Sequence, residues 1–383
     1  MSLFLRAASG ENTATAPIWI MRQAGRHLPE YRALKEKYSF WQLARTPELA
    51  AEVTLQPVRR YGMDAAILFS DIMTPLPAMG LALDFKPGPV FEEPIRDPRQ
   101  VDSLRIPHQE EIAPFVADAL RLIRKESPVP VIGFAGAPLT LATYIVQGGG
   151  SKDYAEFRVF LRQEPVAAHA LLDRLTEVTI RYLTLQIEAG AQAVQLFDSW
   201  AGLHDARSYA EFGRPYAKRV LEALEIHRVA RIYLAVDASH LYDEISRLPA
   251  EAVSVDWRLS LSAVRDHLPG KTLQGNLDPS LLLAPPKTLV AEAIRVLREG
   301  RGGAHIFNLG HGILPQTDPG AVALLIDTVK TFDRHAESEA PKAAGLRPVG
   351  STVFFDGLEV EPARPGESSR RGSRRDSSEE ESE

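Results

Sequence analysis

Residues 193–200 read AVQLFDSW, a run of mostly apolar residues that gives way at once to Asp198, Ser199 and Trp200. A short run of this kind, without a charge, is typical of a strand buried on both faces of a parallel sheet. The same pattern, an apolar run followed by polar or glycine residues, recurs along the chain. The eight runs are 17–21, 65–69, 129–134, 193–197, 232–236, 252–255, 272–275 and 304–307.

Helical patterns separate most of these runs. Apolar residues recur at spacings of three and four in the segments 47–61, 165–189 and 285–299. Eight strands that alternate with helices predict an α/β fold, a single (β/α)8 TIM barrel. The alternative is an open, doubly wound sheet, which needs fewer strands and usually a glycine-rich first turn. No G-x-G-x-x-G follows the first run, so the barrel is favoured.

The C-terminal part of the chain has a different composition. Residues 364–383 contain no aliphatic or aromatic side chain and cannot bury enough surface to offset the entropy of ordering. We therefore expect a catalytic barrel domain over 1–335, followed by a linker and a disordered, acidic, Ser- and Arg-rich tail over 336–383. Residues 336–383 carry a net charge of −4 out of −6 for the whole chain. The nearly neutral remainder predicts neither nucleic acid nor a membrane as a partner.

The chain has 383 residues and no cysteine. This excludes disulfides, a thiolate nucleophile, an iron–sulfur cluster and cysteine-ligated zinc. The N-terminal sequence MSLFLRAASG lacks the basic start and apolar stretch of a signal peptide. The uncharged stretch 127–151 holds too many prolines and glycines for a membrane-spanning helix, and it predicts a buried strand followed by a loop. We expect a cytoplasmic protein.

The residues that follow the runs are polar, ionisable or glycine. In a TIM barrel the carboxyl ends of the strands meet at one mouth, where active sites lie, so we expect a site there. In chain order these residues are Arg22, Gln23, Ala24, Gly25 and Arg26; Ser70 and Asp71; 135–138, with Tyr144 further on; Asp198, Ser199 and Trp200; Asp237; Asp256; Asn276; and 308–312, which includes His311.

The charged residues among them have ordinary structural explanations as well. Arg22 and Arg26 can each hold a carboxylate bidentately, but exposed arginines at a helix start are common. Their spacing would place both on one side of a helix, whereas Gly25 favours a tight loop. Asp71 can bind a ligand or cap the turn that follows it.

The same holds for the aromatic and hydroxyl residues. Tyr144 can be a half-buried aromatic with a solvated tip, and Ser199 can be a helix N-cap. His311, between two glycines, can pair with an anion, shuttle a proton, or be held by the backbone of a tight turn. For Phe134 and Phe197, core packing is a better explanation than a pocket wall.

Six strings, taken in order, resemble the uroporphyrinogen decarboxylase family. They are MRQAGRHLPEYR (21–32), LFSDIMTP (68–75), IGFAGAPLTLATYIVQGGGS (132–151), QLFDSWAG (195–202), LQGNLDP (273–279) and NLGHGILP (308–315). The resemblance spans roughly residues 17–335. It implies a cofactor-free (β/α)8 barrel that forms a homodimer. Such an enzyme converts the four acetate side chains of uroporphyrinogen III to methyl groups and yields coproporphyrinogen III.

The resemblance also implies roles for individual residues. Substrate binding falls to Arg22, Gln23, Ala24, Gly25, Arg26, Asp71, Tyr144, Ser199 and His311, with Phe134 and Phe197 as candidates for an apolar pocket wall. Asp71 would accept hydrogen bonds from several pyrrole NH groups and stabilise a cationic ring. Arg22 is the positional candidate for the acid that protonates the pyrrole, but a guanidinium is a poor proton donor, so a bound water is an equal candidate. No metal and no cofactor are expected.

Two other functions compete with this one. A tetrapyrrole-binding protein without turnover would use the same ligands, because sequence does not reveal transition-state stabilisation. A corrinoid-linked methyltransferase can share the barrel, but those enzymes hold zinc with at least one cysteine. The absence of cysteine argues against that alternative.

Overall fold

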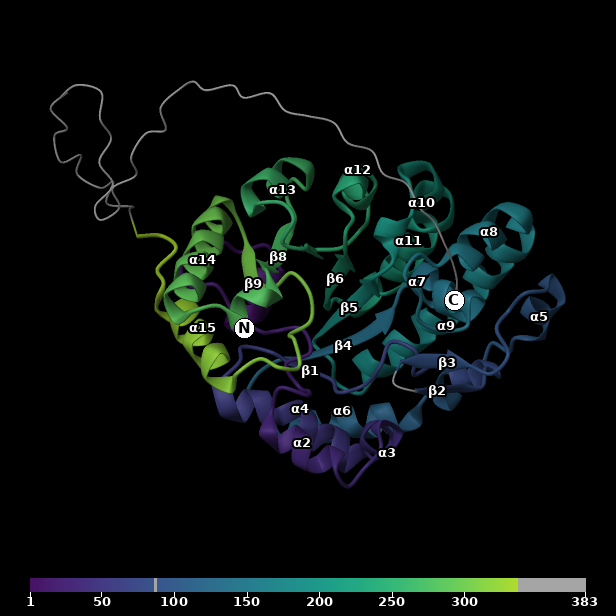
Figure 1. The fold of residues 1–383 in the computed structure, drawn as a ribbon, viewed down its shortest axis with the longest axis horizontal. Coiled ribbons are helices and arrows are strands. Elements are labelled where there is room, and N and C mark those ends of the chain that lie inside the picture. Colours follow the sequence, from purple (N-terminus) through teal and green to yellow (C-terminus); the bar gives the residue numbers. More distant parts are fainter. Residues whose placement is uncertain (86–87, 337–383) are drawn as a thin grey trace, which may run out of the picture. The chain divides into compact units, whose positions relative to one another are not determined.

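The computed structural model describes residues 1–85 and 88–336. Its central feature is a parallel sheet of seven strands in the order β1-β4-β5-β6-β7-β8-β9, which curls round on itself inside a layer of helices (Figure 1). The strands are β1 (Ala66–Ile67), β4 (Val131–Gly136), β5 (Ala193–Asp198), β6 (Ala230–Ala235), β7 (Ala252–Ser254), β8 (Thr272–Leu277) and β9 (His305–Leu309). The predicted TIM barrel is thereby confirmed. A separate hairpin pairs β2 (Leu83–Phe85) with β3 (Pro89–Phe91).

The prediction of a first strand at 17–21 is wrong, although this segment still closes the barrel. Only an isolated bridge forms there, between Ile18 and Phe307 of β9, where the Phe307 N–H donates to the carbonyl of Pro17 at 2.8 Å. On its other side the Ile18 carbonyl accepts from the N–H of Asp64 at 2.9 Å, and the Ile18 N–H donates to the Asp64 carboxylate at 2.8 Å. Pro17 has no N–H, and Ile18 gives its own to a side chain, so a regular ladder does not extend.

The outer layer consists of helices, four of which precede β1 and the rest of which lie between or after the strands. The helices are α1 (Leu3–Ala8), α2 (Pro29–Lys35), α3 (Phe40–Arg45), α4 (Pro47–Tyr61), α5 (Pro98–Ser103), α6 (Pro114–Glu126), α7 (Pro138–Gln147), α8 (Ala155–Gln163), α9 (Pro165–Glu188), α10 (Ala206–Phe212), α11 (Arg214–Ala223), α12 (Tyr242–Ile245), α13 (Leu261–His267), α14 (Pro286–Glu299) and α15 (Pro319–Thr331). The predicted segments 47–61, 165–189 and 285–299 are confirmed as α4, α9 and α14, to within one residue at either end.

The loop predicted after the strand in 127–151 is wrong, because most of it is α7. Pro138 occupies the first turn of that helix, and Gly148, in the left-handed conformation at φ +89°, ends it. The nine residues between these two breakers contain neither proline nor glycine, so the breakers flank the helix without interrupting it. None of the described helices is both long and apolar enough to cross a membrane.

The barrel interior holds a buried polar layer beneath its mouth. The Trp19 indole N–H donates to Gln274 of β8 at 2.9 Å, and the Gln274 amide donates to Gln195 of β5 at 2.9 Å. Gln195 therefore points inward, and Phe197, two residues further along β5, shares that face. Phe197 packs edge-to-face on Phe134 of β4, with the ring centroids 5.4 Å apart, and forms an apolar floor above the polar layer.

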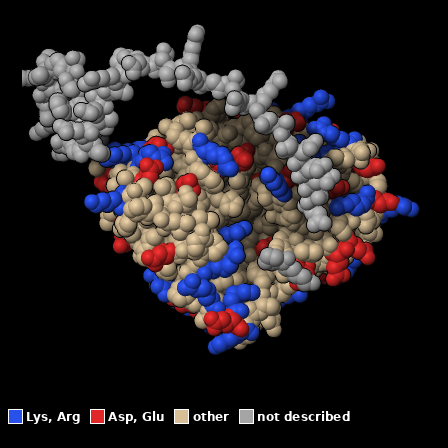
Figure 2. Space-filling view, viewed as in Figure 1, with Lys and Arg blue, Asp and Glu red and all other residues tan. Residues whose placement is uncertain are grey.

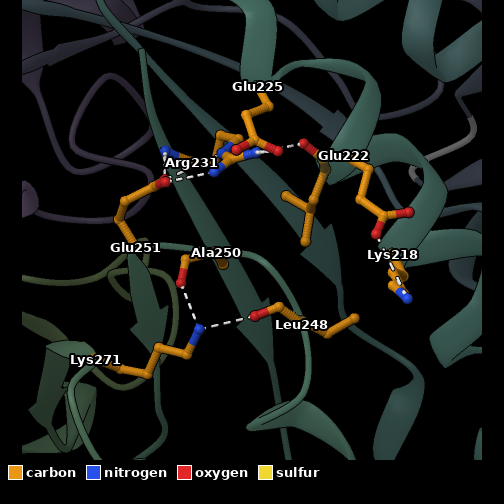
Figure 3. Close-up of polar contacts among 9 residues, drawn as sticks. Lys218, Glu222, Glu225, Arg231, Leu248, Ala250, Glu251 and Lys271 are labelled. Atoms are coloured by element: carbon orange, nitrogen blue, oxygen red, sulfur yellow. Dashed lines mark hydrogen bonds and ion pairs between the residues drawn. The ribbon is translucent and has the colours of Figure 1, made fainter. Parts of the chain in front are cut away.

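Charged residues at the amino ends of β6 to β8 hold the opposite end of the sheet together (Figure 3). Arg231, almost fully buried, donates from its side chain to both carboxylate oxygens of Glu251, and its backbone N–H donates to the same carboxylate at 2.8 Å. Lys271 donates to the carbonyls of Leu248 and Ala250, at 2.8 Å each. These contacts join three neighbouring strands at their amino ends, opposite the mouth, so we assign them to stability.

Candidate active site

The turn that carries Arg22 to Arg26 is fixed by the buried side chain of Gln23. Its amide oxygen accepts from the N–H of Ile20 at 3.0 Å, and its amide nitrogen donates to the carbonyl of Ala65 at 3.0 Å, next to β1. Arg22 adopts a left-handed φ of +63°, which costs a non-glycine residue about 1–2 kcal/mol. The segment is a tight turn, as Gly25 indicates, and not a helix.

This turn presents charged and backbone donors to solvent. The side chains of Arg22 and Arg26 are exposed. The backbone N–H groups of Ala24 and Gly25 donate to no acceptor within the described ranges. Both kinds of donor suit an anion. Gln23 differs from its neighbours, because its side chain is already satisfied inside the protein.

The loop after β9 packs directly on this turn. The N–H of Ile313 donates to the carbonyl of Met21 at 3.0 Å, and the N–H of Met21 donates to the side chain of Asn308 at 3.0 Å. Gly312 lies against Arg22 so closely that a Cβ there would fall 2.6 Å from the Arg22 Cδ. The two loops together therefore fix the conformation of the Arg22 side chain.

Asp71 combines the two roles that sequence left open. Its Oδ1 accepts from the N–H of Met73 at 2.9 Å, which caps the turn after β1. Its Oδ2 has no hydrogen-bond partner within the part of the chain that the structure describes. Enclosure by the protein raises the pKa of the Asp71 carboxyl, while the Met73 N–H and the nearby Arg22 guanidinium oppose the rise. One carboxylate oxygen thus remains available beside Arg22.

Tyr144, on α7, lies in the same neighbourhood. Its ring contacts those of Tyr154 and Trp200, at centroid distances of 5.7 and 5.8 Å. Burial raises the pKa of Tyr144; the Asp71 carboxylate adds to that rise and Arg22 opposes it. Ser199 is half-buried in the turn between β5 and Trp200. Tyr144 and the turn of Ser199 are thereby placed side by side.

His311 completes the group on the side of β9. Burial lowers the pKa of His311 below 6.5, Arg22 and Arg258 lower it further, and Asp256 opposes them. The imidazole is therefore neutral near pH 7. Arg22 thus lies close enough to Asp71, Tyr144 and His311 to influence the pKa of each. Phe134 and Phe197 lie buried inside the barrel, as core packing and a pocket floor both require.

Arg258 belongs to this rim but was missed by sequence reasoning. The buried Asp256 carboxylate accepts from the N–H of Asp237 at 2.5 Å and from both the N–H and the guanidinium of Arg258 at 2.9 Å. Asn276 donates to the carbonyl of Asp256 at 2.9 Å. The loops after β6, β7 and β8 are joined in this way. The signal for Arg258 was available, since it is the second residue after the aspartate that follows the sixth run.

The mouth stands out in charge as well as in position. Figure 2 shows one face of the molecule, hollowed near its centre, with Lys and Arg side chains gathered beside the hollow. Within residues 1–85 and 88–336, no three His, Asp or Glu side chains are grouped as a metal site requires. A TIM barrel whose rim sets exposed arginines beside a half-free carboxylate belongs to the class of barrel enzymes that act on anionic substrates.

Comparison with known proteins narrows this class. The family model described as Uroporphyrinogen decarboxylase (URO-D) matches residues 1–332. The uroporphyrinogen decarboxylase of Geobacter metallireducens is 46% identical over 330 residues, which cover 85% of this chain and 97% of that protein. That of Geobacillus thermodenitrificans is 48% identical over 326 residues, covering 84% and 94%. The chain belongs to the uroporphyrinogen decarboxylase family.

Solved structures agree on the fold. A methyltransferase from Methanosarcina mazei superimposes with a TM-score of 0.73 at 21% sequence identity, covering 87% of this chain and 99% of that one. At this identity the likeness shows the shared barrel and carries nothing about the reaction.

Proposed function

We propose that this protein is a uroporphyrinogen decarboxylase that converts the four acetate side chains of uroporphyrinogen III to methyl groups and releases coproporphyrinogen III. The observation that carries the proposal is the position of Asp71, whose free Oδ2 lies beside Arg22 at the mouth of a barrel of this family. An anionic acceptor at that point suits a ring that presents several N–H donors and becomes cationic during the reaction.

The chemistry needs a temporary sink for electrons. Protonation of a pyrrole α-carbon makes the ring a cationic iminium, which accepts the electron pair of the breaking carbon–carboxylate bond as CO2 departs. Reprotonation of the exocyclic carbon and loss of the ring proton complete the step. Each turnover thus consumes one acetate carboxylate and one proton and yields one methyl group and one CO2. Asp71 stabilises the cationic intermediate through its charge.

The eight carboxylates of the substrate require donors around the ring. Arg22 and Arg26 supply guanidinium groups, which bind carboxylates through paired N–H donors. The backbone N–H groups of Ala24 and Gly25 are free for the same purpose. Gln23 contributes by holding the turn, since both ends of its side chain are engaged.

The remaining rim residues complete the pocket. Tyr144 and Ser199 donate hydroxyl hydrogen bonds to an acetate carboxylate, and the neutral His311 donates to a propionate. Phe134 and Phe197 form the apolar floor beneath the ring. The proton donor is either Arg22 or a water that the site holds. We propose that the reaction uses neither metal nor cofactor.

The biological unit and setting follow from the family. We propose a homodimer that acts in the cytoplasm, with residues 1–335 as the catalytic barrel. The linker and the tail predicted for 336–383 lie, apart from Ala336, outside the described residues. Of the two competing functions, tetrapyrrole binding without turnover is the one to exclude by experiment. The methyltransferase alternative requires a cysteine that holds zinc, and this chain has no cysteine.

The test is anaerobic incubation of the purified protein with uroporphyrinogen III, followed by oxidation and chromatography of the porphyrins. Successive loss of four carboxylates, unchanged in the presence of EDTA, is the expected result. Tight binding of the porphyrinogen without any conversion would assign the protein to the binding class. Activity that EDTA abolishes and zinc restores would overturn the cofactor-free mechanism.

A further inference from the structure

Asp198, which the proposed mechanism does not use, is a fully buried carboxylate at the carboxyl end of β5. Because Phe197 faces the barrel interior, the next side chain points to the opposite face of the sheet, toward the helices. Figure 1 shows α7, α10 and α11 on this outer side of β5 and β6. Asp198 is thus hidden behind the strand that carries the turn of Ser199, and it cannot touch a substrate inside the barrel.

The Asp198 carboxylate is held by hydroxyl groups alone. Its Oδ1 accepts from the Thr140 hydroxyl at 2.7 Å, and its Oδ2 accepts from the Tyr233 hydroxyl at 2.6 Å. The hydroxyls of Tyr233 and Tyr209 lie 2.7 Å apart, and both tyrosines are buried. Arg214 and Glu244, whose charges act on the neighbouring Tyr209, pair with each other at 2.7 Å. Among residues 1–85 and 88–336, no cation pairs with the Asp198 carboxylate, and its hydrogen bonds fix geometry.

Thr140 connects this carboxylate to the rim of the site in two directions. Its Oγ1 accepts from the N–H of Trp200 at 3.2 Å, which fixes the turn that contains Ser199. Thr140 also lies one helical turn before Tyr144 on α7, and residues four apart share one face of a helix. The hydrogen bonds that Thr140 makes with Asp198 and Trp200 therefore fix the rotation of α7 about its axis. They also fix the direction in which the Tyr144 side chain projects.

We propose that Asp198 and Thr140 are positioning residues, which act through α7 and the 198–200 turn to hold the hydroxyls of Tyr144 and Ser199 at the spacing that one acetate carboxylate requires. The inference rests on the proposed substrate role of Tyr144 and Ser199. A displacement of about 1 Å in such groups is enough to lower the rate strongly.

The experiment measures kcat and KM for uroporphyrinogen in four single variants and one double variant. Thr140→Val removes the hydroxyl with little change in shape, and Thr140→Ser keeps it. Thr143→Val is the matched control, because this buried hydroxyl on the same helix donates only to the carbonyl of Leu139, at 2.7 Å. Tyr144→Phe removes the proposed substrate donor, alone and together with Thr140→Val.

Thr140→Val is expected to lower kcat/KM about tenfold, Thr140→Ser to restore it to within about threefold of wild type, and Thr143→Val to have no effect. In the Tyr144→Phe background the effect of Thr140→Val should shrink to roughly threefold or less, since one of the two groups that it positions is gone and only Ser199 remains. Additive losses in the double variant would overturn the inference and leave the proposed function standing. Wild-type kinetics in Tyr144→Phe would instead overturn the assigned role of Tyr144, on which the inference rests.

If the Thr140→Val protein does not fold, Asp198→Asn takes its place in the experiment. This variant retains the shape of the Asp198 side chain and one acceptor oxygen. Asp198→Asn should show the same coupling to Tyr144→Phe. A folded Asp198→Asn enzyme whose loss is the same in both backgrounds would show a merely structural role.

Discussion

Gly312 and Arg22 are in van der Waals contact where the loop after β9 packs on the turn of Arg22, so that a Cβ on Gly312 would lie 2.6 Å from the Cδ of Arg22 and 3.0 Å from its Cγ and Nε. Two segments 290 residues apart in the sequence thus determine the conformation of one side chain. Glycine is required here by proximity, since Gly312 is not among the residues with positive φ.

Gly312→Ala is therefore expected to push Arg22 out of position while the backbone remains unstrained. Loss of a charge-assisted contact to a substrate carboxylate costs about 1.5–3 kcal/mol, or roughly tenfold or more in kcat/KM. Gly320→Ala is the control, because a Cβ there would meet only Asp318, at 3.4 Å or more. Unchanged steady-state kinetics in Gly312→Ala would show that the course of Arg22 is unimportant.

Direct removal of the arginines should have a similar effect. Arg22→Ala and Arg26→Ala are each expected to weaken substrate binding by about 1.5–3 kcal/mol, because each loses a guanidinium pair with a carboxylate. Arg121→Ala, on the outer helix α6 and paired with Asp118, is the control for losing an exposed arginine. If titration with substrate gives wild-type affinity for both variants, the anion site lies elsewhere.

The amino end of the barrel should govern stability without affecting turnover. Glu251→Gln removes the nearer of the two anionic partners of the buried Arg231 and leaves Glu225 at 3.9 Å (Figure 3), so it should lower the free energy of unfolding by about 1–3 kcal/mol, with kcat unchanged. Burial acts to raise the pKa of Glu251, but hydrogen bonds from Arg231 prevail and leave the pKa below 4.5.

The sign of the pH dependence follows from that lowered pKa. The stabilisation by Glu251 is fully present above pH 4.5 and is lost as the pH falls through the folded-state pKa. The difference in unfolding free energy between wild type and Glu251→Gln should therefore stay constant down to about pH 5 and shrink on further acidification, as measured by urea unfolding from pH 7 to about pH 3. A difference that grows in acid would contradict the assignment.

Residues 336–383 are predicted to be dispensable for turnover, whereas Arg334 is not dispensable for folding. The buried Arg334 donates to the carbonyls of Thr13 and Gly303 at 2.8 and 2.7 Å, and its backbone N–H donates to Ala14 at 2.7 Å. A chain ending at His335 should keep wild-type kcat and thermal midpoint, and one ending at Phe332 should melt several degrees lower. Loss of most activity in the longer of the two would assign the tail a catalytic role.

Sequence patterns predicted much of the fold, because they are local. Uncharged runs such as 193–197 are strands since both faces are covered, and Pro47 and Pro165 mark helix starts through the missing N–H. The segment 17–21 failed for a non-local reason. Asp64 takes the N–H of Ile18, and no pattern within the segment announces a partner 46 residues away.

The candidate site shows the same difference between local patterns, which sequence reveals, and contacts between distant segments, which it does not. The positions of Arg22, Asp71 and His311 were predicted from their place after an apolar run, because the barrel topology brings the ends of these runs to a common mouth. The engagement of Gln23 with Ala65 and the contact between Arg22 and Gly312 depend on tertiary packing and could not be predicted from spacing.

The central claim is that the charge of Asp71 stabilises a cationic ring during decarboxylation, and the kinetics of Asp71→Asn test it most directly. The asparagine keeps the shape and the oxygen that accepts from Met73, so the protein should fold and still bind coproporphyrinogen. Loss of an interaction that strengthens in the transition state lowers kcat and kcat/KM together, and comparable groups contribute about 10²–10³ in rate. We predict a kcat at least about tenfold lower; a near-normal kcat with only a raised KM would contradict the account.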